Sequence, residues 1–152
     1  MKNNDTAEHC CSVTLIVTGE DLDPETVTRT LSMAAHKSWT RGEQKSCTLP
    51  DGKVLHFESL YEQGGWRRFL PETETDRPLD DQIRYWLSEL HKRRDAIHEL
   101  LELGCRIELN CFAADGEFLW LSNRELRDLA ELGVDLSLTI ASDFQGQDQT
   151  EG

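Results

Sequence analysis

The chain has 152 residues, the usual size of one domain, and 38% of them are hydrophobic. Its 29 acidic and 16 basic side chains give a formal net charge of −13, so its field repels phosphate backbones and anionic lipid heads. We therefore expect neither nucleic acid nor a membrane as a partner. A field of this sign instead favours encounter with a basic protein, although acidity that serves only solubility is the alternative.

The location of the protein is predicted from its hydropathy and its cysteines. No stretch approaches the roughly twenty apolar residues of a membrane span, and residues 1–8 lack the apolar segment of a signal peptide. The five cysteines form an odd set without a CxxC pair, which indicates free thiols in a reducing compartment. We therefore expect a cytoplasmic protein, with Cys105 and Cys111 as small core residues.

Composition divides the chain into one domain and two tails. Residues 1–11 and 143–152 are polar and have no hydrophobic periodicity, so we expect both to be flexible. Residues 12–142 carry the apolar blocks and form the predicted single domain.

The first predicted elements are a strand and a short helix. Residues 13–18 are rich in β-formers, and Gly19 ends the run. Asp23 suits an N-cap and Pro24 the first helical position, so we expect a helix to about Met33.

An antiparallel meander is predicted over residues 36–70. Asp51-Gly52 is a strong hairpin signal, and weak alternation follows it. Residues 72–77, between two prolines, have neither strand nor helix chemistry.

A long helix is the clearest predicted element, over residues 79–103. Gly104 follows it as the expected C′ residue. Apolar residues recur along it at spacings of three and four, at Leu79, Ile83, Trp86, Leu87, Leu90, Ile97 and Leu101.

The last predicted elements are a hairpin, a short helix and a strand. Strands at 106–112 and 118–121 flank an Asp115-Gly116 turn. Ser122 and Glu125 match a capping box, which opens a helix that Gly133 ends before a strand over 134–141. This order predicts an α+β fold, a mostly antiparallel sheet with one long and two short helices packed against it.

A metal site on the long helix is a possibility that the sequence argues against. His91, Asp95, His98 and Glu102 fall on one face at helical spacing. Three cationic residues, at 92–94, crowd the same turns and oppose a metal cation. We therefore expect no metal and no cofactor.

No sequence signature of catalysis is present. The chain has no GxSxG, no Ser-x-x-Lys and no Cys/His signature, and neither phosphate-binding glycine loop occurs. We therefore expect a protein that is not an enzyme. A hydrolase that uses paired carboxylates remains open, because acids are abundant.

Two acidic clusters are the candidate partner-binding sites. One surrounds the start of the first helix, at Glu20, Asp21, Asp23 and Glu25, and its candidate partner-binding residues are Glu20 and Asp21. The other surrounds the start of the long helix, where Asp80 and Asp81 complement exposed helical amides. The loop acids of this second cluster have no such local role, which favours an interaction surface. Its members are Glu72, Glu74, Asp76, Asp80 and Asp81.

Tryptophans supply a second binding signal, because Trp and Arg are enriched among interface hot spots. Trp86 lies on the predicted apolar stripe. Trp39, with Arg41 nearby, and Trp66, followed by two arginines, could anchor a partner.

The order of several short segments resembles bacterial domain-of-unknown-function family 4279. It covers about residues 13–141, and a proline that often follows the family's first helix is replaced by Met33-Ala34-Ala35-His36. The segments that carry it are Leu22-Asp23-Pro24-Glu25, Val27-Thr28, Leu31, Trp39, Gly42-Glu43, Trp66, the long helix with its Gly104 stop, and Leu129-x-x-Leu132-Gly133-x-Asp135-Leu136.

The resemblance implies an α+β fold and no established activity. Some small acidic bacterial proteins of this type resemble immunity proteins, which neutralise a partner toxin. The leading hypothesis is thus a non-catalytic acidic protein that binds a basic partner, such as a cognate toxin. The alternatives are a regulatory or adaptor module with several weak partners, and an unrecognised hydrolase.

Overall fold

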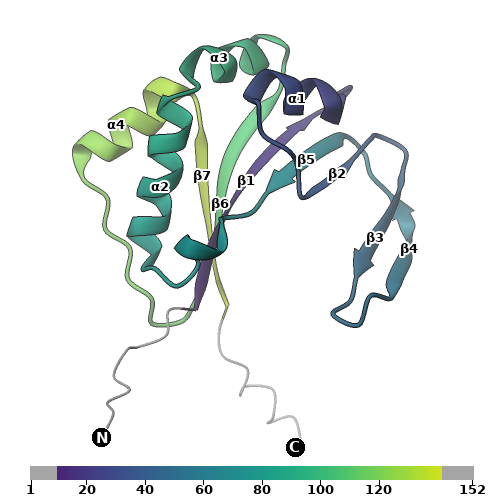
Figure 1. Cartoon of the computed structure of the whole chain (residues 1–152), viewed down its shortest axis with the longest axis horizontal. Helices are drawn as coiled ribbons and strands as arrows, with labels where there is room; N and C mark the ends of the chain where they lie inside the picture. The colour runs from purple at the N-terminus through teal and green to yellow at the C-terminus, as the bar shows by residue number, and fades with distance from the viewer. Residues whose placement is uncertain (1–9, 142–152) are drawn as a thin grey trace, which may run out of the picture.

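The structure is a computed structural model that describes residues 10–141, and it confirms the α+β class (Figure 1). Residues 1–9 and 142–152 lie outside the described residues, and with them most of the predicted N-terminal tail and all of the predicted C-terminal tail, 143–152. The elements in chain order are β1 (Cys11–Gly19), α1 (Pro24–Leu31), β2 (Lys37–Trp39), β3 (Gln44–Thr48), β4 (Val54–Leu60), β5 (Gly64–Arg68), the 3-10 helix η1 (Glu72–Glu74), α2 (Leu79–His91), α3 (Arg94–Glu102), β6 (Arg106–Ala114), α4 (Asn123–Leu132) and β7 (Asp135–Ala141).

The main sheet has five strands in the order β2-β5-β1-β6-β7. Its pairs are antiparallel except β6 with β7, which run parallel because α4 carries the chain back between them. Alternate residues of β1, Val13, Leu15 and Val17, are buried, and the helices cover this face of the sheet (Figure 1). The other face has no helix over it among the described residues.

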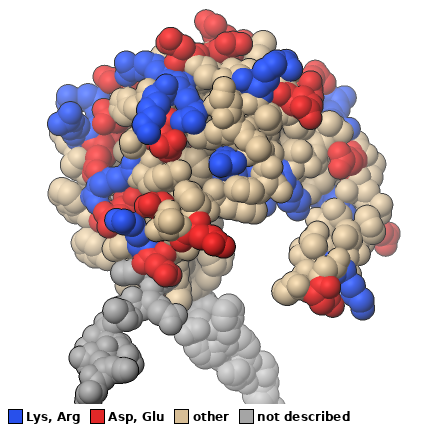
Figure 2. Space-filling view, viewed as in Figure 1, with Lys and Arg blue, Asp and Glu red and all other residues tan. Residues whose placement is uncertain are grey.

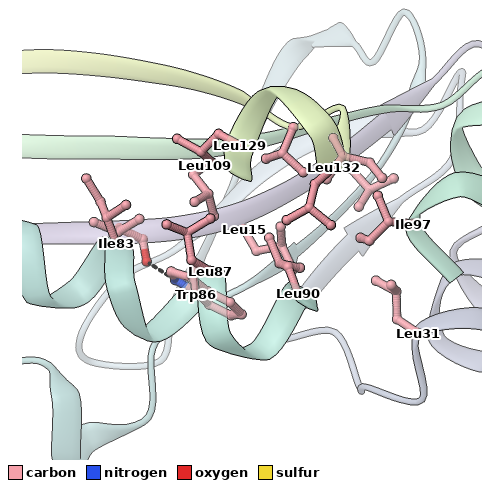
Figure 3. Close-up of a cluster of buried hydrophobic side chains, with 14 of the residues drawn as sticks. Leu15, Leu31, Ile83, Trp86, Leu87, Leu90, Ile97, Leu109, Leu129 and Leu132 are labelled. Atoms are coloured by element: carbon pink, nitrogen blue, oxygen red, sulfur yellow. Dashed lines mark hydrogen bonds between the residues drawn. The ribbon is translucent and has the colours of Figure 1, made fainter. Parts of the chain in front are cut away.

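The core lies between the sheet and the helix layer. Figure 3 shows leucines and isoleucines of α2, α3 and α4 meeting the residues of β1 and β6. Trp86 is buried there, and its indole Nε1 donates to the backbone oxygen of Val13 at 2.9 Å. This bond satisfies the one polar group of the side chain and fixes α2 over β1.

The predicted helix signals at both ends of the chain are confirmed. The carboxylate of Asp23 accepts from the amide of Glu25 at the start of α1. Ser122 and Glu125 form both bonds of a capping box at the start of α4. Gly133 ends α4 with a positive φ of 79°, a conformation that costs glycine little.

The single long helix predicted over residues 79–103 is wrong, because the chain forms two helices there. α2 ends at His91 and α3 begins at Arg94. Between them Arg93 has φ −119° and ψ 28°, outside the helical region. Its guanidinium donates to the backbone oxygens of Leu31 at 2.9 Å and of Glu89 at 2.9 Å. Arg93 thus joins the end of α1 to the break, and the break lets α3 pack on α1.

The strand predicted at 118–121 is also wrong. After the turn at Asp115-Gly116, the chain crosses to the helix layer in an irregular segment. Leu119 and Leu121 pack against the core there, and the alternation that suggested a strand reflects this one-sided packing. β7, and not this segment, is the second neighbour of β6.

Residues 36–70 do not form a simple meander. β2 pairs directly with β5, while β3 and β4 form a separate two-stranded sheet. The predicted Asp51-Gly52 turn joins β3 to β4, and Figure 1 shows this hairpin projecting from the body. We call β3 and β4 the arm.

No helix within residues 10–141 combines the length and the apolar character needed to cross a membrane.

Candidate functional site

The predicted site residues fall at two ends of β1. The acids of the second cluster lie near its first residue, since Gln82 of α2 bonds the backbone of Cys11. Glu20 and Asp21 directly follow its last residue, Gly19, and Trp39 lies at that end, beside Gly65. Nine extended residues separate the two ends by about 26 Å. The structure thus brings five of the eight predicted residues to one end and the other three to the opposite end.

Gln82 holds the acidic loop in place from inside the core. It is fully buried, and its Nε2 donates to the backbone oxygens of Arg77 at 3.0 Å, Thr75 at 3.3 Å and Cys11 at 3.3 Å. The loop that follows η1 is therefore tied to both α2 and β1. A loop fixed in this way presents its carboxylates without a large ordering cost on binding.

Arg84 organises the acids at the start of α2. Its Nε lies 2.6 Å from Glu125 Oε2, and its Nη1 lies 3.0 Å from Asp81 Oδ1. Its Nη2 lies 3.9 Å from Asp80 Oδ2. The hydrogen bond from Arg84 lowers the pKa of Glu125, and the same bond raises the pKa of Arg84. Both groups stay charged at neutral pH.

The same network fixes Trp120, which sequence reasoning did not select. The amide of Trp120 donates to Asp80 Oδ1 at 3.1 Å, and its carbonyl accepts from Arg84 at 3.5 Å. Its side chain nevertheless remains 58% exposed, and that of Phe118 in the same segment is 72% exposed. The only signal in the sequence for the exposure of these two side chains was the alternation of Phe118 and Trp120 with the inward Leu119 and Leu121. We call the surface of Glu72, Glu74, Asp76, Asp80, Asp81, Phe118 and Trp120 the acidic–aromatic surface.

Negative charge is in excess on this surface. Glu74 pairs with Arg77 at 3.3 Å, and Arg84 is shared by Asp80 and Asp81. Within residues 10–141, Glu72 and Asp76 have no ion-pair partner. Figure 2 shows red side chains at the lower end of the body, where η1 and the first turns of α2 lie.

The opposite end of β1 is more nearly neutral. Arg41 Nη1 lies 3.5 Å from Asp21 and 3.9 Å from Glu20. An open pocket of about 540 Å³ beside them is lined by both acidic and basic groups, Glu20, Glu62 and Lys45 among them. The three acids there are partly offset by Arg41 and Lys45.

Trp39 joins the arm to the sheet. Its ring is 7% exposed, stacks on Tyr61 at a centroid distance of 4.6 Å, and donates from Nε1 to Gln63 O at 3.1 Å. The ring lies directly over Gly65, where a Cβ would come within 2.0 Å of it. Its predicted role in partner binding stays a prediction. Trp66, the other suggested anchor, is fully buried, with its Nε1 bonded to Thr28.

The helix break separates the residues weighed as metal ligands. His91 ends α2 and lies 3.7 Å from Asp128, whereas Asp95, His98 and Glu102 belong to α3. In the part of the chain that the structure describes, no group of three or more His, Cys, Asp or Glu is arranged to hold a metal ion.

Cys11 and Cys111, two of the three thiols that lie in or against the core, are poor nucleophiles. Burial raises the pKa of Cys111 to about 12 and, with the nearby Glu117 carboxylate, that of Cys11 to about 11. Both thiols therefore remain protonated at neutral pH.

The comparisons with known proteins identify the family. No curated protein and no solved structure matches the chain. Residues 9–143 match the family described as "Domain of unknown function (DUF4279)", which agrees with the resemblance seen in the sequence. Because this match covers most of the 152 residues, the chain belongs to the DUF4279 family.

Proposed function

We propose that this chain is a non-catalytic binding protein that recognises a basic protein through the acidic–aromatic surface. In this proposal the partner is a toxin or effector, and binding neutralises it, as an immunity protein does. The observation that carries the proposal is Trp120, an exposed tryptophan with a backbone held by Asp80 and Arg84.

The position of Trp120 suits an interface hot spot. Tryptophan buries a large area at a small cost in side-chain entropy, and hot spots are enriched in it. Both hydrogen bonds of its backbone and the capping box at Ser122 fix the segment before any partner arrives. An exposed aromatic residue on a fixed backbone supports recognition by a rigid surface.

The charges around Trp120 support a basic partner. The carboxylates of Glu72 and Asp76 are exposed, and the net charge of −13 adds a long-range field of the same sign. Complementary fields raise association rates and exclude partners of like charge. Arg77 and Arg84 remain paired within the surface and leave the excess negative.

The test of this proposal begins with the identification of the partner. The chain is used to capture proteins from the native cell at low and at high salt, and the basic protein that it retains is purified separately. A single partner that binds at one-to-one stoichiometry and loses its toxic activity supports the proposal. Several weak partners would instead indicate the regulatory or adaptor module.

We predict that Trp120→Ala weakens binding to that partner by about 2 kcal/mol, or about thirtyfold, because it removes the central aromatic anchor. Titration calorimetry measures the change. The matched control is Phe112→Ala, since Phe112 is a half-exposed aromatic residue on the uncovered face of the sheet. An affinity unchanged by Trp120→Ala would remove this surface from the interface.

A further inference from the structure

The arm exposes an unusual amount of apolar surface. Every residue of β4 is exposed, and its large apolar side chains are Val54, Leu55, Phe57 and Leu60, each between 44% and 55% exposed. Lys37 Nζ donates to Ser46 O at 3.1 Å, and Tyr61 stacks on Trp39, both near the base of the arm. A two-stranded sheet with no further cover is only marginally stable in water. The arm therefore has the properties of an element that is completed by a partner.

Among residues 10–141, no strand pairs with the edge of β4 that faces away from β3. Leu49 N donates to Lys53 O at 2.8 Å, Gln44 Nε2 donates to Phe57 O at 2.8 Å, and Tyr61 N donates to Glu43 O at 2.9 Å. Residues 53, 57 and 61 thus turn their backbone groups toward β3. The register changes between Ser46 opposite His56 and Gln44 opposite Leu60, so β4 has two extra residues in this interval. Because two extra residues keep the alternation in phase, Val54, His56 and Leu60 on either side of the irregular segment turn their backbone groups away from β3.

The sequence of β4 is complementary to itself about Phe57. When a second β4 runs antiparallel with Phe57 opposite Phe57, His56 lies opposite Glu58, and Val54 lies opposite Leu60. Val54, His56 and Leu60 have outward backbone groups, so each Val54–Leu60 pair can exchange both backbone hydrogen bonds, whereas Glu58 lies in the irregular segment of β4 and contributes its side chain. The pairing of a carboxylate with an imidazole and the apolar match occur in the same register.

Neighbouring registers lack this complementarity. A shift by two residues in one direction sets Glu58 opposite Glu58, which places like charges in contact. The opposite shift sets His56 opposite His56 and leaves Glu58 facing Val54. The twofold register centred on Phe57 is the one that pairs the acid with the imidazole.

We propose that two copies of this chain associate through their β4 edges, antiparallel about a twofold axis at Phe57. The two arms then form one four-stranded sheet in the order β3-β4-β4-β3. A symmetric pairing of identical edges closes on itself and leaves no further edge of β4 to extend. The arm projects away from α2, so the acidic–aromatic surface of each copy remains accessible (Figure 1).

The strength of this dimer follows from its small contact and its charge. One strand pair buries less than the roughly 800 Å² per partner of a standard interface. We therefore expect a dissociation constant in the micromolar range. Two copies that each carry −13 repel one another, and salt screens that repulsion. The dimer should therefore become stronger as salt is added.

Sedimentation velocity of the full chain, over about 1 to about 200 µM, tests the dimer. His56→Glu places two carboxylates opposite one another at both symmetry-related pairs, and Glu58→Lys removes both acids. We expect the dissociation constant of each variant alone to be at least about tenfold higher than that of the wild type. A mixture of the two variants should recover the dimer. In the mixed dimer the introduced lysine of one copy faces the introduced glutamate of the other, and the remaining His56 faces the remaining Glu58.

A variant elsewhere on the surface controls for the change in charge. Glu131→Lys makes the same change as Glu58→Lys at an exposed position on α4, and we expect it to leave the dimer intact. A wild-type chain that stays monomeric throughout the range would overturn the proposal. So would a dimer that neither arm variant weakens, or a mixture that remains monomeric.

Discussion

Whether a tryptophan side chain in this fold is buried or exposed depends on the residues around it. Trp86 and Trp120 are chemically identical, but the indole of Trp86 is buried and bonded to Val13, whereas that of Trp120 faces solvent. For Trp86 the helical spacing predicted burial correctly, because one face of α2 carries all of its large apolar side chains. The exposure of Trp120 depends on its contacts with Asp80 and Arg84, some forty residues away, which local spacing does not contain.

Leu90 tests the core at the scale of one side chain. It is fully buried near the end of α2. We predict that Leu90→Ala lowers the free energy of unfolding by about 2 to 5 kcal/mol, because it removes apolar contacts and leaves a cavity. Urea denaturation measures the change. Leu103→Ala, at a leucine that is largely exposed, should change the free energy of unfolding by no more than about 0.5 kcal/mol.

At the scale of elements, the sequence predicts where a helix begins and ends better than it predicts whether a helix is continuous. Capping residues act within a few positions, which is why the ends at Asp23, Ser122 and Gly133 were predicted correctly. The break between α2 and α3 was not predicted, because apolar spacing continues across it. At the break, the side chain of Arg93 donates to the carbonyl of Leu31, which is 62 residues away in the sequence and so outside any local pattern.

The candidate site was predictable only for those of its residues that are close together in the sequence. The acids at 72–81 are neighbours in the sequence, so their proximity needed little tertiary information. Trp120, with Phe118 two residues before it, joins Asp80 only because this segment crosses to the helix layer instead of pairing with β6. Because a strand was predicted at 118–121, Phe118 and Trp120 were not predicted as part of the acidic–aromatic surface.

Gln82 tests how one element positions another. We predict that Gln82→Leu lowers the free energy of unfolding by about 1 to 3 kcal/mol, because it leaves the carbonyls of Thr75 and Arg77 without their donor. Amide exchange in residues 72–77 should become faster as the loop loosens. Gln63→Leu is the control at an exposed glutamine. If both variants behave alike, Gln82 does not hold the loop.

The whole molecule presents two surfaces with different chemistry. The acidic–aromatic surface lies at the start of α2, where carboxylates are in excess, and the arm carries a self-complementary strand edge. The two proposals rest on separate residues, so each can fail without the other. If both hold, the dimer presents two copies of the acidic–aromatic surface and binds two partner molecules.

The central claim, recognition of a basic protein by the acids at the start of α2, is tested most directly by association kinetics at two salt concentrations. Two triple variants remove the same charge. Glu72→Gln, Glu74→Gln and Asp76→Asn change the acidic–aromatic surface, whereas Glu99→Gln, Glu102→Gln and Glu131→Gln change exposed acids of α3 and α4. We predict that the first variant associates about tenfold more slowly with a flatter salt dependence, and that the second stays close to the wild type. The claim is contradicted if the first variant keeps the wild-type rate and salt dependence, or if both variants slow association equally.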